Sequence, residues 1–187
     1  MKKLSYKPVT ISEWKDLRKL FSKGHEFSGC WCMYWRIKRS EFSKQYGEKN
    51  KKALRRVIQS GQVPGILAYL GNEPIGWCSI APRDTFPVLD RSPTLKRIDD
   101  KSVWSIVCFF IAKEYRNHGY SKALIKAGLN YAKSNGAQII EAYPLKSTKP
   151  RVQSYQSYMG FHKTFKELGF NDAICRSKIR PIMRLFL

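Results

Sequence analysis

A basic turn between an apolar run and a predicted helix carries the most chemically informative residues of the chain. The run from Val103 to Ile111 is nearly continuous in apolar residues, which is typical of a strand buried on both faces. Arg116 and Gly119 follow, and a helix is predicted to begin at the glycine. A helix N-terminus presents unpaired backbone N–H groups and about half a positive charge, so it binds phosphate readily. The turn therefore predicts an anion site, with an ordinary strand-to-helix connection as the alternative interpretation.

Other motifs for phosphate or metal are absent from the sequence. There is no Gly-x-Gly-x-x-Gly, no Lys-Ser/Thr after the spaced glycine pairs, and no His-Glu-x-x-His or Pro-Cys-x-x-Cys. Cys30-x-Cys32 could bind metal, act in redox chemistry or supply a nucleophile, but an adjacent fourth ligand and a spaced histidine partner are lacking. Burial as small hydrophobic side chains is the alternative for all five cysteines, and Cys78 and Cys108 could meet inside the sheet. We expect no metal site.

The composition is that of one basic globular domain. The chain has 187 residues, with 35 Lys and Arg against 14 Asp and Glu, a formal net charge of +21, and 43% hydrophobic residues. The longest apolar run, Val103 to Ala112, is shorter than the ~20 residues of a membrane-spanning helix. An odd number of cysteines favours reduced thiols. We therefore expect a cytoplasmic protein without a membrane partner.

The positive charge predicts attraction to anions, which include nucleic acid, a membrane surface and a phosphorylated cofactor. Charge alone does not choose among these anions. The lysines are dispersed along the chain, as Lys44, Lys49 and Lys52 illustrate, and form no basic tail. A solvated basic surface is therefore the alternative interpretation.

Periodicity and turn residues predict alternating helices and strands in one mixed sheet with helices on both faces, an α/β or α+β fold. The expected strands are 9–11, a hairpin of 65–70 with 75–80, then 103–111, 137–143, 170–175 and 182–187. The expected helices are 12–22, 40–59 with an interruption near Gly47, 119–135 and 155–168, and residues 82–100 are expected to form a loop.

The motif Arg116-x-x-Gly119-x-Ser121, after a buried strand and at the start of a helix, resembles the Arg/Gln-x-x-Gly-x-Gly/Ala signature of the GNAT N-acetyltransferase superfamily. The last small residue is serine here, a mild departure. The segments Gly29–Arg36, Gly76–Arg83 and Pro181–Arg184 resemble a bacterial branch of this superfamily with no established substrate. The resemblance implies one domain over 1–187 with a mostly antiparallel sheet. Its core would span about 63–175, and residues 12–61 would form a helical cover over the acceptor side.

The resemblance further implies an acyltransferase that binds acetyl-CoA as co-substrate. The pantetheine arm would pair with the backbone of Phe109, Phe110 and Ile111. The diphosphate would lie on the turn and first helical residues, with predicted contacts from Arg116, Asn117, His118, Gly119, Tyr120, Ser121 and Lys122.

Catalysis in this superfamily is usually direct attack of an amine on the thioester, which needs a base or a water path. The candidate bases are Glu26, Asp84, Asp100, His118 and Glu141, each with a surface or structural role as the alternative. Many relatives place a proton-donating tyrosine four residues before the closing Gly-Phe. Phe165 stands there in this sequence, and Tyr158 lies seven residues earlier, on about the same face of the predicted helix. Tyr158, Glu141 and Glu26 remain weak candidates.

The resemblance places the acceptor, a small-molecule or peptide amine, under the segment that carries Trp31, Tyr34 and Trp35. These aromatic side chains predict a wall that holds the acceptor by stacking or cation–π contact, with Glu26 pairing with a cationic amine. The alternative is that all three rings fill the core.

Two other functions stay open. The chain could be a basic nucleic-acid-binding module, although the dispersed charge and the lack of a known motif make specific binding unexpected. It could also be a CoA-sensing protein without turnover, because the usual tyrosine is missing. We expect a monomer or a homodimer.

Overall fold

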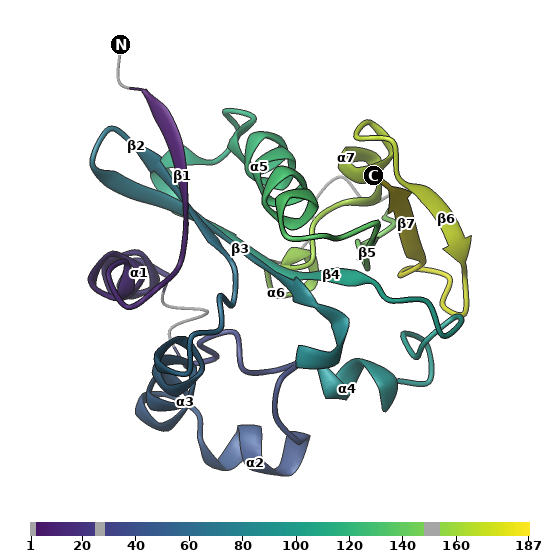
Figure 1. Cartoon of the computed structure of the whole chain (residues 1–187), viewed down its shortest axis with the longest axis horizontal. Helices are drawn as coiled ribbons and strands as arrows, with labels where there is room; N and C mark the ends of the chain where they lie inside the picture. Colours follow the sequence, from purple (N-terminus) through teal and green to yellow (C-terminus); the bar gives the residue numbers. More distant parts are fainter. Residues whose placement is uncertain (1–2, 25–28, 148–153) are drawn as a thin grey trace.

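The computed structural model describes residues 3–24, 29–147 and 154–187. Seven strands form one sheet in the order β1-β2-β3-β4-β5-β7-β6, and every neighbouring pair is antiparallel except β4 with β5 (Figure 1). The strands are β1 Leu4–Pro8, β2 Ile66–Leu70, β3 Glu73–Pro82, β4 Trp104–Ile111, β5 Ile139–Ala142, β6 Asn171–Ile174 and β7 Ile182–Phe186. The mixed, mostly antiparallel sheet predicted from the sequence is confirmed.

Helices cover both faces of the sheet (Figure 1). They are α1 Trp14–Ser22, α2 Arg39–Lys44, α3 Glu48–Gln59, α4 Pro87–Asp90, α5 Tyr120–Ser134, α6 Ser154–Ser157 and α7 His162–Lys166, with short 3₁₀ turns at Arg83–Thr85 and Lys113–Tyr115. The predicted break near Gly47 separates α2 from α3, and the loop over 82–100 contains α4. No helix in the described ranges is long and apolar enough to cross a membrane.

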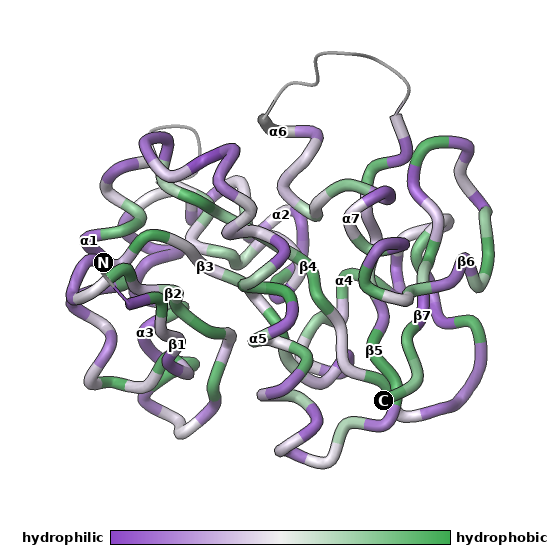
Figure 2. The backbone as a smooth tube through the Cα atoms, turned by 90° about the horizontal axis from the view of Figure 1, so that it is seen from above, coloured by the Kyte–Doolittle hydropathy of each residue, from purple (hydrophilic) through white to green (hydrophobic). Residues whose placement is uncertain are grey.

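Two hydrophobic clusters lie on opposite faces of the sheet. Helices α1 and α3 and the segment 29–37 pack on one face, around Trp77 and Phe110. Helices α5 and α7 pack on the other, around Ile80 and Phe109. Gly128 brings α5 close to the sheet, since an added Cβ would lie 3.5 Å from Ile80 Cδ1. Strand β4 runs between β3 and β5 through the middle of the molecule, and it is buried over most of its length. This burial explains its apolar sequence (Figure 2).

Two predicted elements are wrong in position. The first strand is Leu4–Pro8 and not 9–11. It lies at the edge of the sheet, and only Leu4 and Tyr6 pack on the hydrophobic cluster, so its alternation of apolar and polar residues is too short to predict a strand. The predicted helix over 155–168 is interrupted, because Gly160 adopts φ +82 and the chain then pairs Phe161 with Leu145. The sheet also extends beyond the predicted core of 63–175, since β1 and β7 belong to it.

Candidate functional site

The site begins where β4 parts from β5. The two strands pair only from Trp104 to Ile106, and a bulge at Val107 then shifts the register of β4 against β3. A bulge bends a strand and increases its local twist. Residues Phe109–Ile111 therefore keep β3 on one side while the other edge of β4 turns away from β5.

The turn after α6 partly fills this opening. The Phe109 N–H donates a 2.6 Å hydrogen bond to the Tyr158 carbonyl oxygen. Backbone groups along a strand alternate between its two edges, so the N–H of Ile111 lies on the same edge as that of Phe109. Gly160 closes the turn at positive φ, and a Cβ there would lie 2.8 Å from the Phe165 ring. Only glycine combines this backbone with so close an approach.

A groove of about 240 Å³ follows this edge of β4 as far as the start of α5. Seven residues singled out from the sequence line it: Phe109, Phe110, Ile111, Arg116, Asn117, Ser121 and Tyr158. Five further lining residues escaped sequence reasoning: Ile125, Ser157, Gly160, Phe161 and Thr164. The dipeptide Gly160-Phe161 was the available signal, because a glycine within a helical pattern marks a possible break.

The N-terminus of α5 forms the far end of the groove. Gly119 is its N-cap at φ +75, and Asn117 also has positive φ, a conformation that asparagine tolerates well. The carbonyl of Gly119 accepts hydrogen bonds from Lys122 and Ala123, so the N–H groups of Tyr120 and Ser121 precede the helical ladder. No heavy atom lies within 4 Å of a Cβ added to Gly119, so the space beside it is open. This end fits an anionic group such as a diphosphate.

The remaining residues of the predicted cofactor loop have different surroundings. Arg116 Nε donates a 3.0 Å hydrogen bond to the carbonyl of Ile111, which ties the turn to the end of β4. His118 Nδ1 lies 2.6 Å from the Arg116 carbonyl oxygen, and the His118 ring stacks on Tyr120. Lys122 forms a 3.1 Å ion pair with Glu167, so its charge is partly compensated outside the groove.

Tyr158 lies at the other end of the groove, against the face that α1 and α3 cover. Its ring packs edge-on to Tyr34, with 6.4 Å between centroids, and the Arg180 guanidinium lies 5.8 Å from its centroid. Burial raises the pKa of Tyr158 to about 12, although Arg180, Arg39 and the Trp35 indole favour the phenolate. The hydroxyl is therefore protonated at neutral pH and can donate a hydrogen bond.

Glu141 lies in a buried ion-pair network, as expected for the structural role that was the alternative to its assignment as a base. It is 1% exposed, and its carboxylate accepts hydrogen bonds from Arg83, Tyr143 and Arg184 at 2.9, 2.8 and 2.9 Å. Asp99 completes this buried network by pairing with Arg184. Both carboxylate oxygens are taken up by these donors, and Glu141 is not among the residues that line the groove beside β4. This position favours a structural role over that of a base.

The other candidate bases lie at the surface or outside the described residues. Asp84 pairs with Arg97, and Asp100 is exposed. Glu26 lies outside the residues that the structure describes. His118 stands in the loop before α5, at the end of the groove away from Tyr158.

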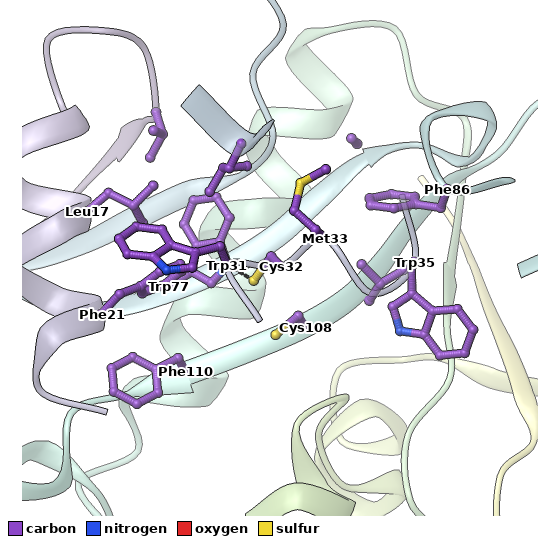
Figure 3. Packing of buried hydrophobic residues seen from close by; sticks show 14 of the residues in the cluster. Leu17, Phe21, Trp31, Cys32, Met33, Trp35, Trp77, Phe86, Cys108 and Phe110 are labelled. Atoms are coloured by element: carbon purple, nitrogen blue, oxygen red, sulfur yellow. Dashed lines mark hydrogen bonds between the residues drawn. The ribbon is translucent and has the colours of Figure 1, made fainter. Parts of the chain in front are cut away.

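The aromatic segment divides between the core and the site. Trp31 is 7% exposed and packs on Trp14 and Phe21, and Trp35 is 6% exposed. The two indoles point in different directions from the segment, on either side of Met33 (Figure 3). Tyr34 packs edge-on to Tyr158, and the Trp35 indole also lies beside the Tyr158 hydroxyl. Arg39 lies 3.3 Å from the Tyr34 ring centroid. Trp31 instead packs in the core on Trp14 and Phe21, so the three aromatic side chains do not form one wall.

The cysteines are all free thiols. Within the described ranges, no group of three or more His, Cys, Asp or Glu side chains is arranged to hold a metal ion. Cys78 and Cys108 do not meet inside the sheet, because Cys78 faces the α5 side and Cys108 the α1 side.

Comparisons with known proteins agree with this geometry. The profile of the Acetyltransferase (GNAT) family matches residues 15–161. The PaiA N-acetyltransferase from Thermoplasma acidophilum, solved with coenzyme A, is similar with a TM-score of 0.57 at 14% identity, over 99% of both chains. The mosquito arylalkylamine N-acetyltransferase-like protein 5b gives a TM-score of 0.60 at 9% identity, over 99% of this chain and 100% of that chain. No curated protein matches the sequence.

Identities this low show a shared fold alone, whereas the family profile reports on the sequence itself. The matched region runs from α1 to Phe161, so it contains the open edge of β4, the Arg116–Ser121 turn and Tyr158. The resemblance inferred from that turn is thus confirmed, and the chain belongs to the GNAT acetyltransferase family.

Proposed function

We propose that this protein is an acetyl-CoA-dependent N-acetyltransferase in which an amine attacks the thioester directly. The observation that carries the proposal is the groove that joins the open edge of β4 to the N-terminus of α5. One end offers backbone groups in an extended strand, and the other offers free helical N–H groups beside Arg116. Coenzyme A combines an extended amide-containing arm with a diphosphate, and these two ends match its two parts.

The backbone on the open edge of β4 would hold the pantetheine arm. The N–H of Ile111 is on this edge, and strand-like pairing would fix the arm in register with β4. The N–H groups of Tyr120 and Ser121 would hold the diphosphate, with positive charge from Arg116. Because Gly119 has no side chain, a phosphate oxygen can approach the backbone closely.

Bound acetyl-CoA supplies an activated acyl group to the attacking amine. Tyr158 lines the same groove and would donate a hydrogen bond to sulfur as negative charge develops there. A thiol has an ordinary pKa of about 8.5, and the pKa of Tyr158 is about 12, so complete proton transfer from the phenol is unfavourable. Tyr158 would therefore stabilise the leaving thiolate as a hydrogen-bond donor. The amine proton would leave through water, since Glu141 and Asp84 are held in ion pairs.

The acceptor would approach from the α1 side, past Tyr34 and Tyr158. Two aromatic side chains at this point suit a small-molecule or peptide amine with an apolar or aromatic neighbouring group. The name of the mosquito relative gives an arylalkylamine for that protein, which supports the inclusion of such amines as candidates. We place the reaction in the cytoplasm, because reduced cysteines persist there. A monomer or a homodimer would carry it out.

An amine-panel screen with detection of free CoA thiol tests the proposal. The panel contains arylalkylamines, polyamines, amino acids and short peptides, each incubated with acetyl-CoA and enzyme. Amine-dependent thiol release, with the acetylated amine identified by mass spectrometry, supports acetyl transfer. Saturable CoA binding without amine-dependent release across the whole panel would contradict it and favour the CoA-sensing function instead.

A further inference from the structure

A cluster of thiols lies next to β4, on the face opposite α5, and the proposed acetyl transfer does not use it. Cys30, Cys32 and Cys108 line a cavity of about 10 Å³ together with Phe21 and Phe110. Cys32 and Cys108 come from segments far apart in the sequence, and Figure 3 shows the Cys32 sulfur beside Trp77 and the Cys108 sulfur near it on β4. A cavity of this size holds about one water-sized molecule.

A strained turn delivers Cys32 to this cluster. The Met33 N–H donates a 3.0 Å hydrogen bond to the Cys30 carbonyl, and the two residues between them, Trp31 and Cys32, have φ of 48° and 52°. A tight turn with positive φ at both central positions normally takes glycine or asparagine. Here a tryptophan and a cysteine occupy these positions, and both side chains are buried.

The Cys32 sulfur accepts hydrogen bonds from two donors. Trp77 Nε1–H donates to Sγ at 3.0 Å, drawn as a dashed line in Figure 3. The Cys108 thiol lines the same cavity, lies 4.0 Å from the Phe109 carbonyl oxygen, and is the second donor group beside the Cys32 sulfur. Cys30 instead turns its sulfur toward the backbone N–H groups of Cys32 and Met33. Two donors directed at one sulfur are the arrangement expected around a thiolate.

A buried guanidinium supplies the matching charge. Arg36 is 9% exposed, donates one 3.2 Å hydrogen bond to the Pro64 carbonyl, and stacks 4.4 Å from the Phe86 ring centroid. Its Nε has no hydrogen-bond partner among the described residues. Cys32 is the charged group that raises the pKa of Arg36 against the effect of burial.

The protonation states around the cluster are consistent with one thiolate among neutral thiols. The Cys108 and Trp77 donors and the Arg36 charge lower the pKa of Cys32 against the effect of its burial. Burial raises the pKa of Cys30 to about 12, and the contact with Cys32 raises that of Cys108 well above its usual value. Burial and the Cys32 charge also raise the pKa of Cys78, which lies on the other face of the sheet.

We propose that Cys32 is an oxidation site for a small hydroperoxide and that Cys108 is its resolving thiol. The Cys32 thiolate attacks one peroxide oxygen, the O–O bond breaks, and the other oxygen leaves and takes a proton from water. This step reduces the peroxide to an alcohol or water and oxidises Cys32 to a sulfenic acid. Cys108 then loses its proton and attacks the Cys32 sulfur, and a disulfide forms with release of water. Two thiols and one hydroperoxide thus give one disulfide, one alcohol or water, and one further water.

The position of Cys108 gives this disulfide a consequence for the site. Cys108 directly precedes Phe109, whose N–H bonds to the Tyr158 carbonyl. A Cys32–Cys108 bond would fasten the segment 29–37 to β4 immediately beside the groove. Cys30 is partly exposed and lines the same cavity, so the path for a small peroxide passes its side chain.

Peptide mass spectrometry after a hydrogen peroxide titration tests the proposal on the full chain. The reduced protein is treated with increasing peroxide, blocked with iodoacetamide and digested. We expect a Cys32–Cys108 cross-linked peptide at peroxide concentrations that leave Cys175 alkylated and unoxidised. Cys175 is the internal control because it is an exposed cysteine remote from the cluster. Oxidation of Cys175 before Cys32, or a Cys30–Cys32 disulfide as the first product, would overturn the assignment.

Variants separate the two roles. Cys108→Ser should stop at a Cys32 sulfenic acid that dimedone traps, Cys32→Ser should give neither product, and Cys175→Ser should behave as the wild type. Trp77→Phe removes one donor to Cys32 and keeps an aromatic ring in the core. We expect it to slow oxidation by a few-fold, because loss of this donor raises the pKa of Cys32 and lowers its thiolate fraction. Circular dichroism of each variant confirms folding, and a folded Cys108→Ser protein without a dimedone adduct on Cys32 would refute the proposal.

Discussion

The N–H of Phe109 donates a 2.6 Å hydrogen bond to the carbonyl oxygen of Tyr158, and this bond joins the central strand to the turn after α6. It occupies one backbone donor on the open edge of β4, and Arg116 Nε occupies a backbone acceptor, the Ile111 carbonyl, at the end of the strand. It also fixes the backbone from which the Tyr158 ring extends toward Tyr34. The same hydrogen bond therefore positions both the strand that would bind pantetheine and the hydroxyl that would meet its sulfur.

Replacing Tyr158 with phenylalanine should lower kcat by about 10²-fold and leave the Kd for CoA unchanged, because only the hydroxyl is removed. Steady-state kinetics and calorimetry on the same preparation measure the two quantities. Tyr34→Phe is the matched control and should keep kcat, since its ring contacts Tyr158 but its hydroxyl has no assigned role. Because the pKa of Tyr158 is raised to about 12, its deprotonation should not depress kcat between neutral pH and 10. A wild-type kcat in Tyr158→Phe would remove the hydroxyl from the mechanism.

Substitution of Gly119 separates backbone strain from obstruction of the anion site. At φ +75, alanine or valine should lower the free energy of unfolding by about 1–2 kcal/mol through backbone strain. Neither residue would meet a heavy atom within 4 Å of its Cβ. Both variants should fold, and Gly119→Val should abolish CoA binding because its branches fill the space beside the free N–H groups. Gly119→Ala should bind more weakly than wild type but measurably, and Arg116→Ala should weaken binding by about tenfold. Unchanged affinity in a folded Gly119→Val protein would show that the turn is only a connection.

Phe165, in the position where the family resemblance leads us to expect a tyrosine, should matter for stability alone. Its side chain is 0% exposed and packs on Phe109 and Phe170, with centroid distances of 6.0 and 5.0 Å. Phe165→Ala should cost about 3–5 kcal/mol in the free energy of unfolding, and Phe165→Leu should cost less because it leaves a smaller cavity. Urea denaturation gives both values. A Phe165→Leu protein of normal stability with a large loss of kcat would contradict this assignment.

Glu141→Gln tests whether the buried carboxylate is structural. Its removal leaves the guanidinium groups of Arg83 and Arg184 without their shared partner, which should cost about 3–5 kcal/mol of unfolding free energy. Activity per folded molecule should stay close to that of the wild type. Asp84→Asn is the control at an exposed ion pair and should change stability by less than about 0.5 kcal/mol. A stable Glu141→Gln protein with kcat reduced more than about 10²-fold would restore Glu141 as a base.

Local signals predicted the strand, turn and helix around Gly119, because an apolar run, a glycine and an amphipathic helix are each encoded within a few residues. These signals predicted an anion site at the turn, and the resemblance to the GNAT family added Phe109, Phe110 and Ile111, which line the groove. The interruption at Gly160 was missed because the helical pattern continues across it. What breaks the helix is a tertiary contact, the pairing of Phe161 with Leu145, which no local pattern carries.

Partners distant in sequence explain the other corrections. Glu141 looked like a site carboxylate beside the cofactor strand, but Arg83 and Arg184, 58 and 43 residues away, bind it. The sequence suggests that Cys108 meets Cys78, because their two strands are adjacent. The register places Cys78 opposite Phe109, so the two thiols face opposite sides of the sheet and Cys108 meets Cys32 instead. Side-chain alternation predicts this outcome only once the register is known.

Calorimetric titration of CoA into the wild-type protein tests most directly whether the groove beside β4 holds the cofactor. We expect saturable binding at one site and a stabilisation of about 2.7 kcal/mol when CoA is present at 100 times its Kd. Gly119→Val should lose both effects. Absence of binding heat, together with an unchanged unfolding temperature at millimolar CoA, would show that the groove does not hold CoA.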